Sequence, residues 1–174
     1  GGTAQIPEPE VTAIQFTGDL RRPEQQLRDL LRLNEGDRFD FYRWQQDLDR
    51  LRASYQEQGF YEVRVRGSRE TSPDEKTVVL LYDIEPGPVA ELEIVGHDLD
   101  EQLQNEIRDS WMRSIFDRFL IEEVTARVQR HLIAENYIGS LVEVTIPLST
   151  PERKQLRIAV EPGALVGSRE IAYS

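Results

Sequence analysis

Apolar and polar residues alternate, and then change period, along the first half of the chain. Residues 11–18 alternate and end at Gly18, which predicts a strand followed by a turn. Leucines recur at helical spacing after Pro23, so a short helix is predicted between Pro23 and Gly36. A second helix is expected after Asp40, a favoured N-cap residue, because apolar positions recur in steps of three and four: Phe41, Trp44, Leu48, Leu51 and Tyr55.

Two more strands complete this first unit. Gly59 ends the second helix, and residues 60–66 then alternate apolar with charged positions, which is typical of a half-exposed edge strand. Residues 67–76 are rich in Ser, Pro, Asp and Gly, and we interpret them as a hairpin loop. Residues 77–84 are apolar on both faces, which predicts a central strand.

The same order of patterns recurs in the second half. Glu85-Pro86-Gly87 is repeated as Glu161-Pro162-Gly163, 76 positions later (161 − 85), and the alternating segment that ends at Gly18 has a counterpart that ends at Gly96. Asp37-Arg38-Phe39 likewise recurs as Asp117-Arg118-Phe119. Several features that recur in one order indicate a duplicated module rather than chance use of turn residues.

The second module is expected to repeat strand, helix, helix, strand, strand. Its last two strands are predicted over residues 137–146 and 155–161. Its helices are predicted by two apolar stripes, Leu99, Leu103, Ile107, Trp111 and Ile115 in the first and Ile121, Val124, Val128 and Leu132 in the second.

We therefore divide the chain into four parts. Residues 1–10 are expected to be a cloning remnant and leader, because they open Gly-Gly-Thr without an initiator Met. Residues 11–87 form the first module and 88–163 the second. The segment 164–174 begins the first-strand pattern again and is expected to start a further module.

The order of elements predicts the sheet. The fold class is α+β, with two tandem β-α-α-β-β modules, each a three-stranded mixed sheet covered on one face by two helices. If successive elements reverse direction, the first and third strands run parallel and the apolar third strand lies between the others. The second strand is then left at a rim, where unpaired N–H and C=O groups form a template for another chain.

The amino-acid composition excludes several classes of function. Asp and Glu outnumber Lys and Arg by 32 to 21, so the formal charge is −11, which disfavours a nucleic-acid backbone as partner. KH domains share this element order, but the loops that would clamp RNA, residues 34–37 and 114–117, lack the glycine pair and carry an acid. Cysteine is absent, which excludes disulfides, thiolate metal sites and a cysteine nucleophile.

Side chains that could act in catalysis, metal binding or ligand stacking are interpreted as structural residues. His97 and His131 have no second His or Cys at ligand spacing. The carboxylates Asp98, Asp100, Glu122 and Glu123 are interpreted as helix-start charges. Helical spacing assigns Phe41, Trp44, Tyr55, Trp111 and Phe119 to the core rather than to stacking platforms. No catalytic, cofactor-binding or metal-binding residue, and no enzyme activity, is predicted.

The tandem element order resembles a known family. Each first strand ends in glycine, Gln58-Gly59-Phe60-Tyr61 precedes the edge strand, and Glu-Pro-Gly leads directly into the next module. Together these features resemble POTRA domains of the BamA/TamA outer-membrane protein insertase superfamily, over roughly Val11 to Gly163. The second module departs from the pattern, with Asn136-Tyr137-Ile138 in place of Gly59-Phe60-Tyr61 and with Gly139 displaced into the strand.

The resemblance implies a periplasmic location and a C-terminal membrane β-barrel of the same chain that is absent here. It implies that the modules receive unfolded outer-membrane polypeptides and dock accessory envelope lipoproteins or chaperones. It implies no enzyme activity and no cofactor. Nucleic acid is not expected as a partner.

Combined with the predicted rim, the resemblance suggests that an extended client polypeptide adds as a strand. The candidate partner-binding residues are Tyr61, Glu62, Val63, Arg64, Val65 and Arg66 in the first module and Leu141, Val142, Glu143, Val144 and Thr145 in the second. A proline at Val63 is expected to remove a rim donor.

Two alternatives stay open. Arg64 and Arg66 could equally protect the edge against aggregation. The modules could instead be a structural spacer and docking arm, in a two-partner secretion transporter or another POTRA-bearing envelope protein, that binds folded partners through its helical faces.

Overall fold

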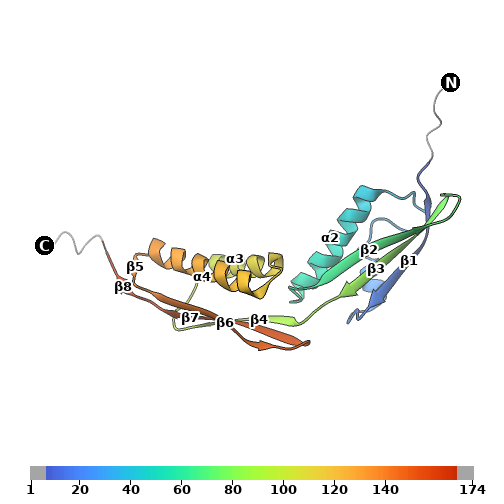
Figure 1. The fold of residues 1–174 in the computed structure, drawn as a ribbon. Coiled ribbons are helices and arrows are strands. Elements are labelled where there is room, and N and C mark those ends of the chain that lie inside the picture. Colours follow the sequence, from blue (N-terminus) through green and yellow to red (C-terminus); the bar gives the residue numbers. More distant parts are fainter. Residues whose placement is uncertain (1–6, 168–174) are drawn as a thin grey trace, which may run out of the picture. The chain divides into compact units, whose positions relative to one another are not determined.

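Each half of the chain folds into its own α+β unit, and the division falls between Gly87 and Pro88 (Figure 1). The computed structural model describes residues 7–167. The first unit contains β1 (Glu10–Gly18), α1 (Glu24–Arg28), α2 (Phe41–Glu57), β2 (Arg64–Thr71) and β3 (Thr77–Glu85). The second contains β4 (Val89–Val95), α3 (Glu101–Arg113), α4 (Asp117–Ala134), β5 (Tyr137–Ile138), β6 (Leu141–Ser149), β7 (Arg153–Glu161) and β8 (Ala164–Leu165).

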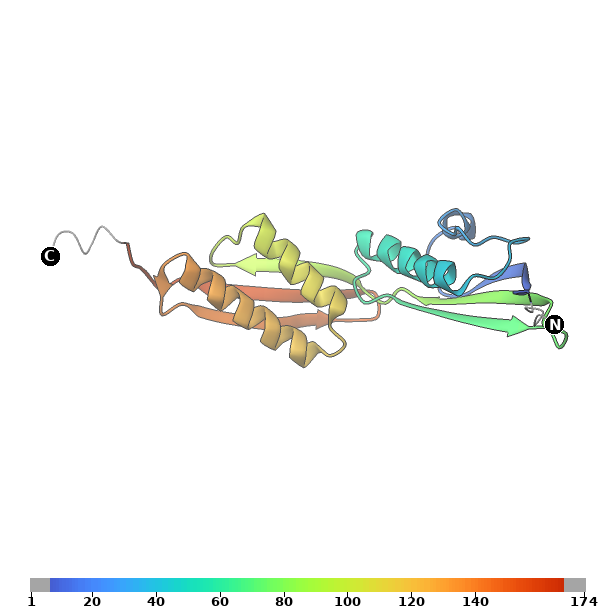
Figure 2. The ribbon, with the colours of Figure 1, turned by 90° about the horizontal axis from the view of Figure 1, so that it is seen from above.

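Both main sheets have the predicted strand order. In the first unit the order is β1-β3-β2, with β1 parallel and β2 antiparallel to β3. In the second it is β4-β7-β6, with the same directions. The helices of each unit lie on one face of its sheet, as Figure 2 shows for α3 and α4. The predicted fold class of two β-α-α-β-β modules is confirmed.

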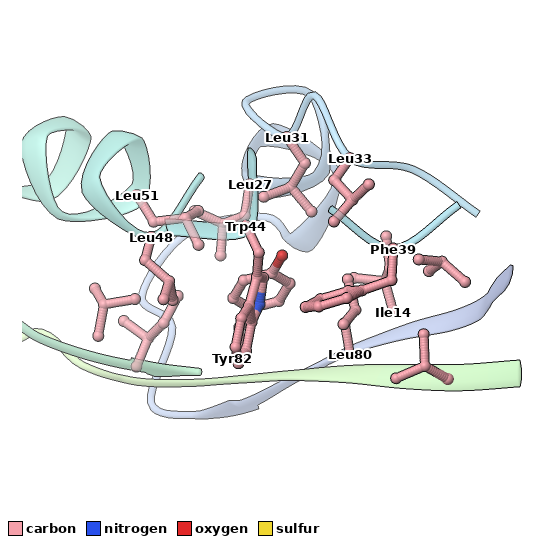
Figure 3. Close-up of a cluster of buried hydrophobic side chains, with 14 of the residues drawn as sticks. Ile14, Leu27, Leu31, Leu33, Phe39, Trp44, Leu48, Leu51, Leu80 and Tyr82 are labelled. Atoms are coloured by element: carbon pink, nitrogen blue, oxygen red, sulfur yellow. The ribbon is translucent and has the colours of Figure 1, made fainter. Parts of the chain in front are cut away.

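The core of the first unit lies between α2 and the sheet (Figure 3). Trp44 projects from α2 toward Tyr82 of β3, and both side chains are buried. β3 is central because its alternate side chains all face the helices, and Val78, Leu80, Tyr82 and Ile84 are each no more than 1% exposed. The second core is built in the same way around Trp111, which is 1% exposed.

The helix ends follow the predicted chemistry. The Asp40 carboxylate accepts a hydrogen bond from the Arg43 N–H at 3.1 Å and so caps α2, and Asp100 caps α3 through the Leu103 N–H at 2.8 Å. Gly59 after α2 has a positive φ of 95°. Asn136 takes this role after α4 with a φ of 70°, which asparagine tolerates better than most residues.

Three residues that the apolar stripes assign to the core are exposed. Phe41 is 57% exposed, Phe119 58% and Ile115 88%. Phe41 is the first residue of α2, and Ile115 lies in the connection between α3 and α4, outside both helices. In the first turn of α4 the inward position belongs to Leu120, which is 1% exposed, so Phe119 turns outward.

The predicted boundaries of the rim strand in the first unit were wrong. β2 starts only at Arg64 and continues to Thr71, through residues interpreted as a hairpin loop, and the turn is confined to Ser72–Lys76. The sequence of Gly67–Thr71 resembles a loop because the side chains on one face of this strand are exposed to solvent. On the face covered by α2, the strand carries Gly67. A Cβ on Gly67 would lie 2.8 Å from Cζ2 of Trp44, so glycine here lets α2 approach the strand closely.

The predicted strand over residues 137–146 is divided in two. Gly139, with a φ of 76°, separates β5 from β6, and β6 continues to Ser149 with a register shift between Thr145 and Leu148. Pro147 lies in this irregular stretch, where a missing N–H is tolerated. Ala164–Leu165 forms β8 and pairs antiparallel with β5.

The predicted terminal segments extend outside the described residues. Residues 1–6 of the expected leader 1–10 lie outside them, and β1 begins at Glu10. Residues 168–174 of the expected start of a further module also lie outside them, and that module stays a prediction.

The glycines that end β1 and β4 make the same close approach. Gly18 has a φ of 98°, and an added Cβ would overlap the carbonyl oxygen of Ile84; Gly96 has a φ of 91°, and its Cβ would overlap the carbonyl oxygen of Val160. Gly36 has a similar φ of 93° but no atom within 4 Å of an added Cβ.

We expect Gly18→Ala to destabilise the first unit more than Gly36→Ala. Both substitutions cost about 1–2 kcal/mol for the left-handed backbone. Gly18→Ala adds a backbone clash, worth about 1–3 kcal/mol more. Urea unfolding of the two variants measures the difference, and equal free energies of unfolding would show that the close approach to Ile84 is unimportant.

Candidate functional site: the rim strands

β2 is paired on one side only. Within residues 7–167 it forms a ladder with β3 and with no other strand. We call this unpaired side the rim of the first unit. A row of peptide groups without strand partners can add a further strand by backbone hydrogen bonding.

The register shows which N–H groups point outward. Pairing is continuous from Arg64↔Glu85 to Thr71↔Val78, and beyond it the Ser72 N–H donates to the Thr77 carbonyl at 2.9 Å. In an antiparallel ladder, hydrogen-bonded pairs alternate with non-hydrogen-bonded pairs. The N–H groups that point away from β3 are therefore those of every second residue before Ser72: Thr71, Arg69, Gly67 and Val65.

The other edge of this sheet is partly occupied. Val11 of β1 donates its N–H to the Asp37 carbonyl and accepts from the Gly36 N–H, both at 2.8 Å. Further along β1, the Arg28 guanidinium donates to the Ile14 carbonyl at 2.7 Å. These contacts satisfy outward groups of β1 at Val11 and Ile14, so β2 offers the longer row of open peptide groups in the first unit.

The six predicted rim residues fall into two groups. Arg64, Val65 and Arg66 lie in β2. Tyr61, Glu62 and Val63 precede the strand, in the turn that follows α2. Val63 is 7% exposed and donates its N–H to the Phe60 carbonyl at 3.3 Å, so it is not a rim donor and a proline there would disturb the turn instead.

The sequence-based prediction missed the C-terminal part of β2, Gly67–Thr71. Arg69 lies there with its guanidinium 4.6 Å from the ring centroid of Phe39 and 6.0 Å from that of Trp44. This places the Arg69 side chain on the helix-covered face of the sheet. The side chains of Arg64 and Arg66 are exposed. A usable sequence signal was the length of β3, whose nine residues need a partner of similar length.

In the second unit, the five predicted residues Leu141–Thr145 form the first part of β6, which is an edge strand. Leu141 is 65% exposed, whereas Val144 is buried. A groove of about 510 Å³ lies across the ends of β4, β7 and β6, and its lining includes Val95, Val160 and Leu141 together with Gln129 of α4.

The histidine in the turn after β4 has a packing role. His97 contacts the ring of Tyr137 edge-on, with centroids 5.3 Å apart. None of the helices within residues 7–167 combines the length and the hydropathy that a membrane span requires.

Comparison with known proteins finds a family match over the first unit. Residues 9–87 match the family model described as POTRA, surface antigen variable number repeat. No curated protein sequence matched the chain.

Several solved structures are similar at low identity. POTRA1-2 of the periplasmic domain of Omp85 from Anabaena is 20% identical and covers 92% of this chain and 96% of its own, with a TM-score of 0.42. Haemophilus influenzae BamA POTRA3-5 is 16% identical, over 90% of this chain and 61% of its own, with a TM-score of 0.47. Escherichia coli CdiB is 14% identical over 94% of this chain, which spans 28% of CdiB, with a TM-score of 0.41.

Proposed function

We propose that the chain receives unfolded polypeptides by strand addition, because its first unit matches the POTRA family model and its second unit repeats the same element order and strand order. In this proposal the chain is the periplasmic POTRA region of a factor that assembles or translocates outer-membrane proteins. The rim of β2 is the primary site and the first part of β6 is the second.

The observation that carries the proposal is the open row of peptide groups on β2. The N–H groups of Gly67, Arg69 and Thr71 point away from β3, and the opposite edge of the sheet is partly engaged by residues 36–37 and by Arg28. An extended client can pair with these groups whatever its side chains are. Such pairing suits a factor that handles many different sequences.

The energetics favour weak, reversible capture. Each backbone hydrogen bond contributes a net of about 0.5–1.5 kcal/mol, and an added strand forms only a few with the rim. The ordering of the client opposes part of this gain. Capture of this strength allows a client to be handed on rather than retained.

Side chains near the rim tune the interaction. Arg64 and Arg66 are exposed and positively charged in a chain whose net charge is −11, so they favour clients with acidic residues at the facing positions. The same charges hinder pairing with a second copy of β2, because like charges would then lie opposite each other. Both effects suit an edge that must bind clients without aggregating.

A second candidate function rests on a different surface. Ile115, Phe116 and Phe119 are all more than half exposed around the connection between α3 and α4, where they form an apolar patch. Phe116 and Phe119 pack edge-to-face, with centroids 5.8 Å apart. A docking arm that binds a folded partner, such as an accessory lipoprotein or chaperone, would use this patch and leave the rim unoccupied.

Paired substitutions at Arg69 separate the two functions. Arg69→Pro removes an outward N–H but no bond to β3, whereas Arg69→Ala keeps the N–H and loses the same contacts to Phe39 and Trp44. We expect Arg69→Pro to bind an unfolded outer-membrane strand peptide about three- to tenfold more weakly than Arg69→Ala, from the loss of one or more backbone hydrogen bonds. Nuclear magnetic resonance titration with the labelled chain measures both affinities.

Thermal unfolding of both variants controls for damage to the fold. Equal peptide affinities in two folded variants would contradict strand addition at β2. Equal affinities together with weaker partner binding by Phe116→Ala would establish the docking arm instead.

A further inference from the structure

Asp100, His131 and Glu135 converge at one end of the helical layer of the second unit. Asp100 is the N-cap of α3, His131 lies in the last turn of α4, and Glu135 is the C-cap of α4. We propose that these three side chains bind one transition-metal ion, with zinc as the expected metal.

The distances suit a single small ion. Nε2 of His131 lies 3.0 Å from Oε1 of Glu135 and 3.7 Å from Oδ2 of Asp100, and the three ligand atoms lie within 4.8 Å of one another. A tetrahedral zinc ion about 2.0–2.2 Å from each ligand atom requires ligand separations of about 3.3–3.6 Å, and the two distances to His131 lie on either side of this range. His131 and Glu135 are one helical turn apart, so α4 holds two ligands on one face.

The third ligand is available without loss of its structural role. Asp100 accepts the capping hydrogen bond from Leu103 through Oδ1, at 2.8 Å, which leaves Oδ2 for the metal. The imidazole is half-buried, and the two carboxylates are exposed. This leaves room for water as a fourth ligand, as in zinc sites with three protein ligands.

The charges around the site also favour a cation. In the part of the chain that the structure describes, Asp100 and Glu135 form ion pairs with His131 alone and with no Lys or Arg. Elsewhere on the same helix pair, Glu106 and Glu123 are both neutralised by Arg127. A bound divalent ion would compensate the two carboxylates that no arginine or lysine compensates.

The donor set selects the metal. An imidazole nitrogen with two carboxylates suits zinc and its neighbours among the transition metals, whereas calcium and magnesium prefer oxygen ligands only. The ion would join the start of α3 to the end of α4. It would thereby restrain Asn136, the residue that precedes β5. The Asn136 carbonyl accepts a hydrogen bond from the Val166 N–H at 2.8 Å.

The test is calorimetric titration of the metal-free 174-residue chain with zinc chloride. One tight site is expected in the unmodified chain. Since even outer partners of metal ligands contribute about 10–100-fold to affinity, His131→Gln and Asp100→Asn should each weaken binding at least about tenfold. Asparagine caps a helix as well as aspartate, so Asp100→Asn leaves α3 intact.

His97→Gln is the matched control, because it removes the other histidine of the chain without touching the site. It should bind zinc as the unmodified chain does. Cobalt bound at the site should show visible absorption bands of tetrahedral coordination, which His131→Gln abolishes.

Either of two results would overturn the proposal. One is zinc affinity that is the same in the unmodified chain and His131→Gln, which would reduce the cluster to a set of ion pairs. The other is calcium binding as tight as zinc binding and insensitive to His131→Gln, which would indicate unspecific attraction to surface carboxylates.

Discussion

Trp111→Ala is expected to lower the free energy of unfolding of the second unit by about 3–5 kcal/mol. Trp111 is the largest fully buried side chain of that unit, 1% exposed among the residues of α3 and α4 that face the sheet. Its removal leaves a cavity that a unit of this size cannot easily close. Folded domains have only about 0.05–0.15 kcal/mol of stability per residue, so one such loss removes a large part of the total.

The measurement is urea unfolding followed through amide resonances of the second unit, because a change in tryptophan fluorescence would be ambiguous in this variant. Phe119→Ala is the control. Phe119 lies in the same helix pair but is 58% exposed, and its removal should cost less than about 1 kcal/mol. Similar losses in the two variants would mean that the second core is not organised around Trp111.

Asp47→Ala should produce an effect of similar size in the first unit. Asp47 lies on the inward face of α2 and is fully buried. Its carboxylate accepts hydrogen bonds from the N–H groups of Arg32 and Leu33, the latter at 2.9 Å, and from the Arg50 guanidinium at 2.7 Å. The carboxylate thereby ties the chain that follows α1 to α2.

Removal of this carboxylate leaves backbone donors without acceptors. Each buried donor that loses its partner costs about 1–3 kcal/mol, so we expect a total of about 3–5 kcal/mol. Asp49→Ala is the matched control on the same helix. Asp49 is exposed, and among residues 7–167 it pairs with Arg52 alone, so its loss should cost less than about 1 kcal/mol in the same urea experiment. Equal effects at the two positions would contradict the structural role of Asp47.

The architecture could be predicted from the sequence because several signals agreed. The apolar pattern of residues 77–84 marked the central strand, and the glycines at 18 and 96 marked equivalent strand ends. Duplication supplied an internal check, since each feature in one half could be sought in the other. The strand order then followed from element order and short connections.

The limits of β2 could not be predicted in the same way. Gly67–Thr71 has the composition of a loop, yet it is strand because β3 extends beside it. The covered face of that segment is filled from α2 by Trp44, so no apolar residue is needed within the strand itself. The limits of β2 are set by contacts with β3 and α2. A local sequence pattern carries no information about such contacts between distant elements.

The roles of two groups of polar residues were not predicted from the sequence, for a related reason. Asp47 stands three residues after Trp44 and directly before Leu48, within the apolar stripe of α2, and that position was an available sign of burial. His131 and Glu135 have helical ligand spacing, but Asp100 lies 31 positions before His131 in the chain (131 − 100). Only the packing of α3 beside α4 brings the three side chains together.

The most direct test of the central claim is amide hydrogen exchange along β2, with and without an unfolded outer-membrane strand peptide. Strand addition predicts slower exchange at Gly67, Arg69 and Thr71, with little change at Ser68 and Glu70, which already face β3. Exchange that stays unchanged at all five amides, while the peptide protects residues of the connection between α3 and α4, would contradict the claim.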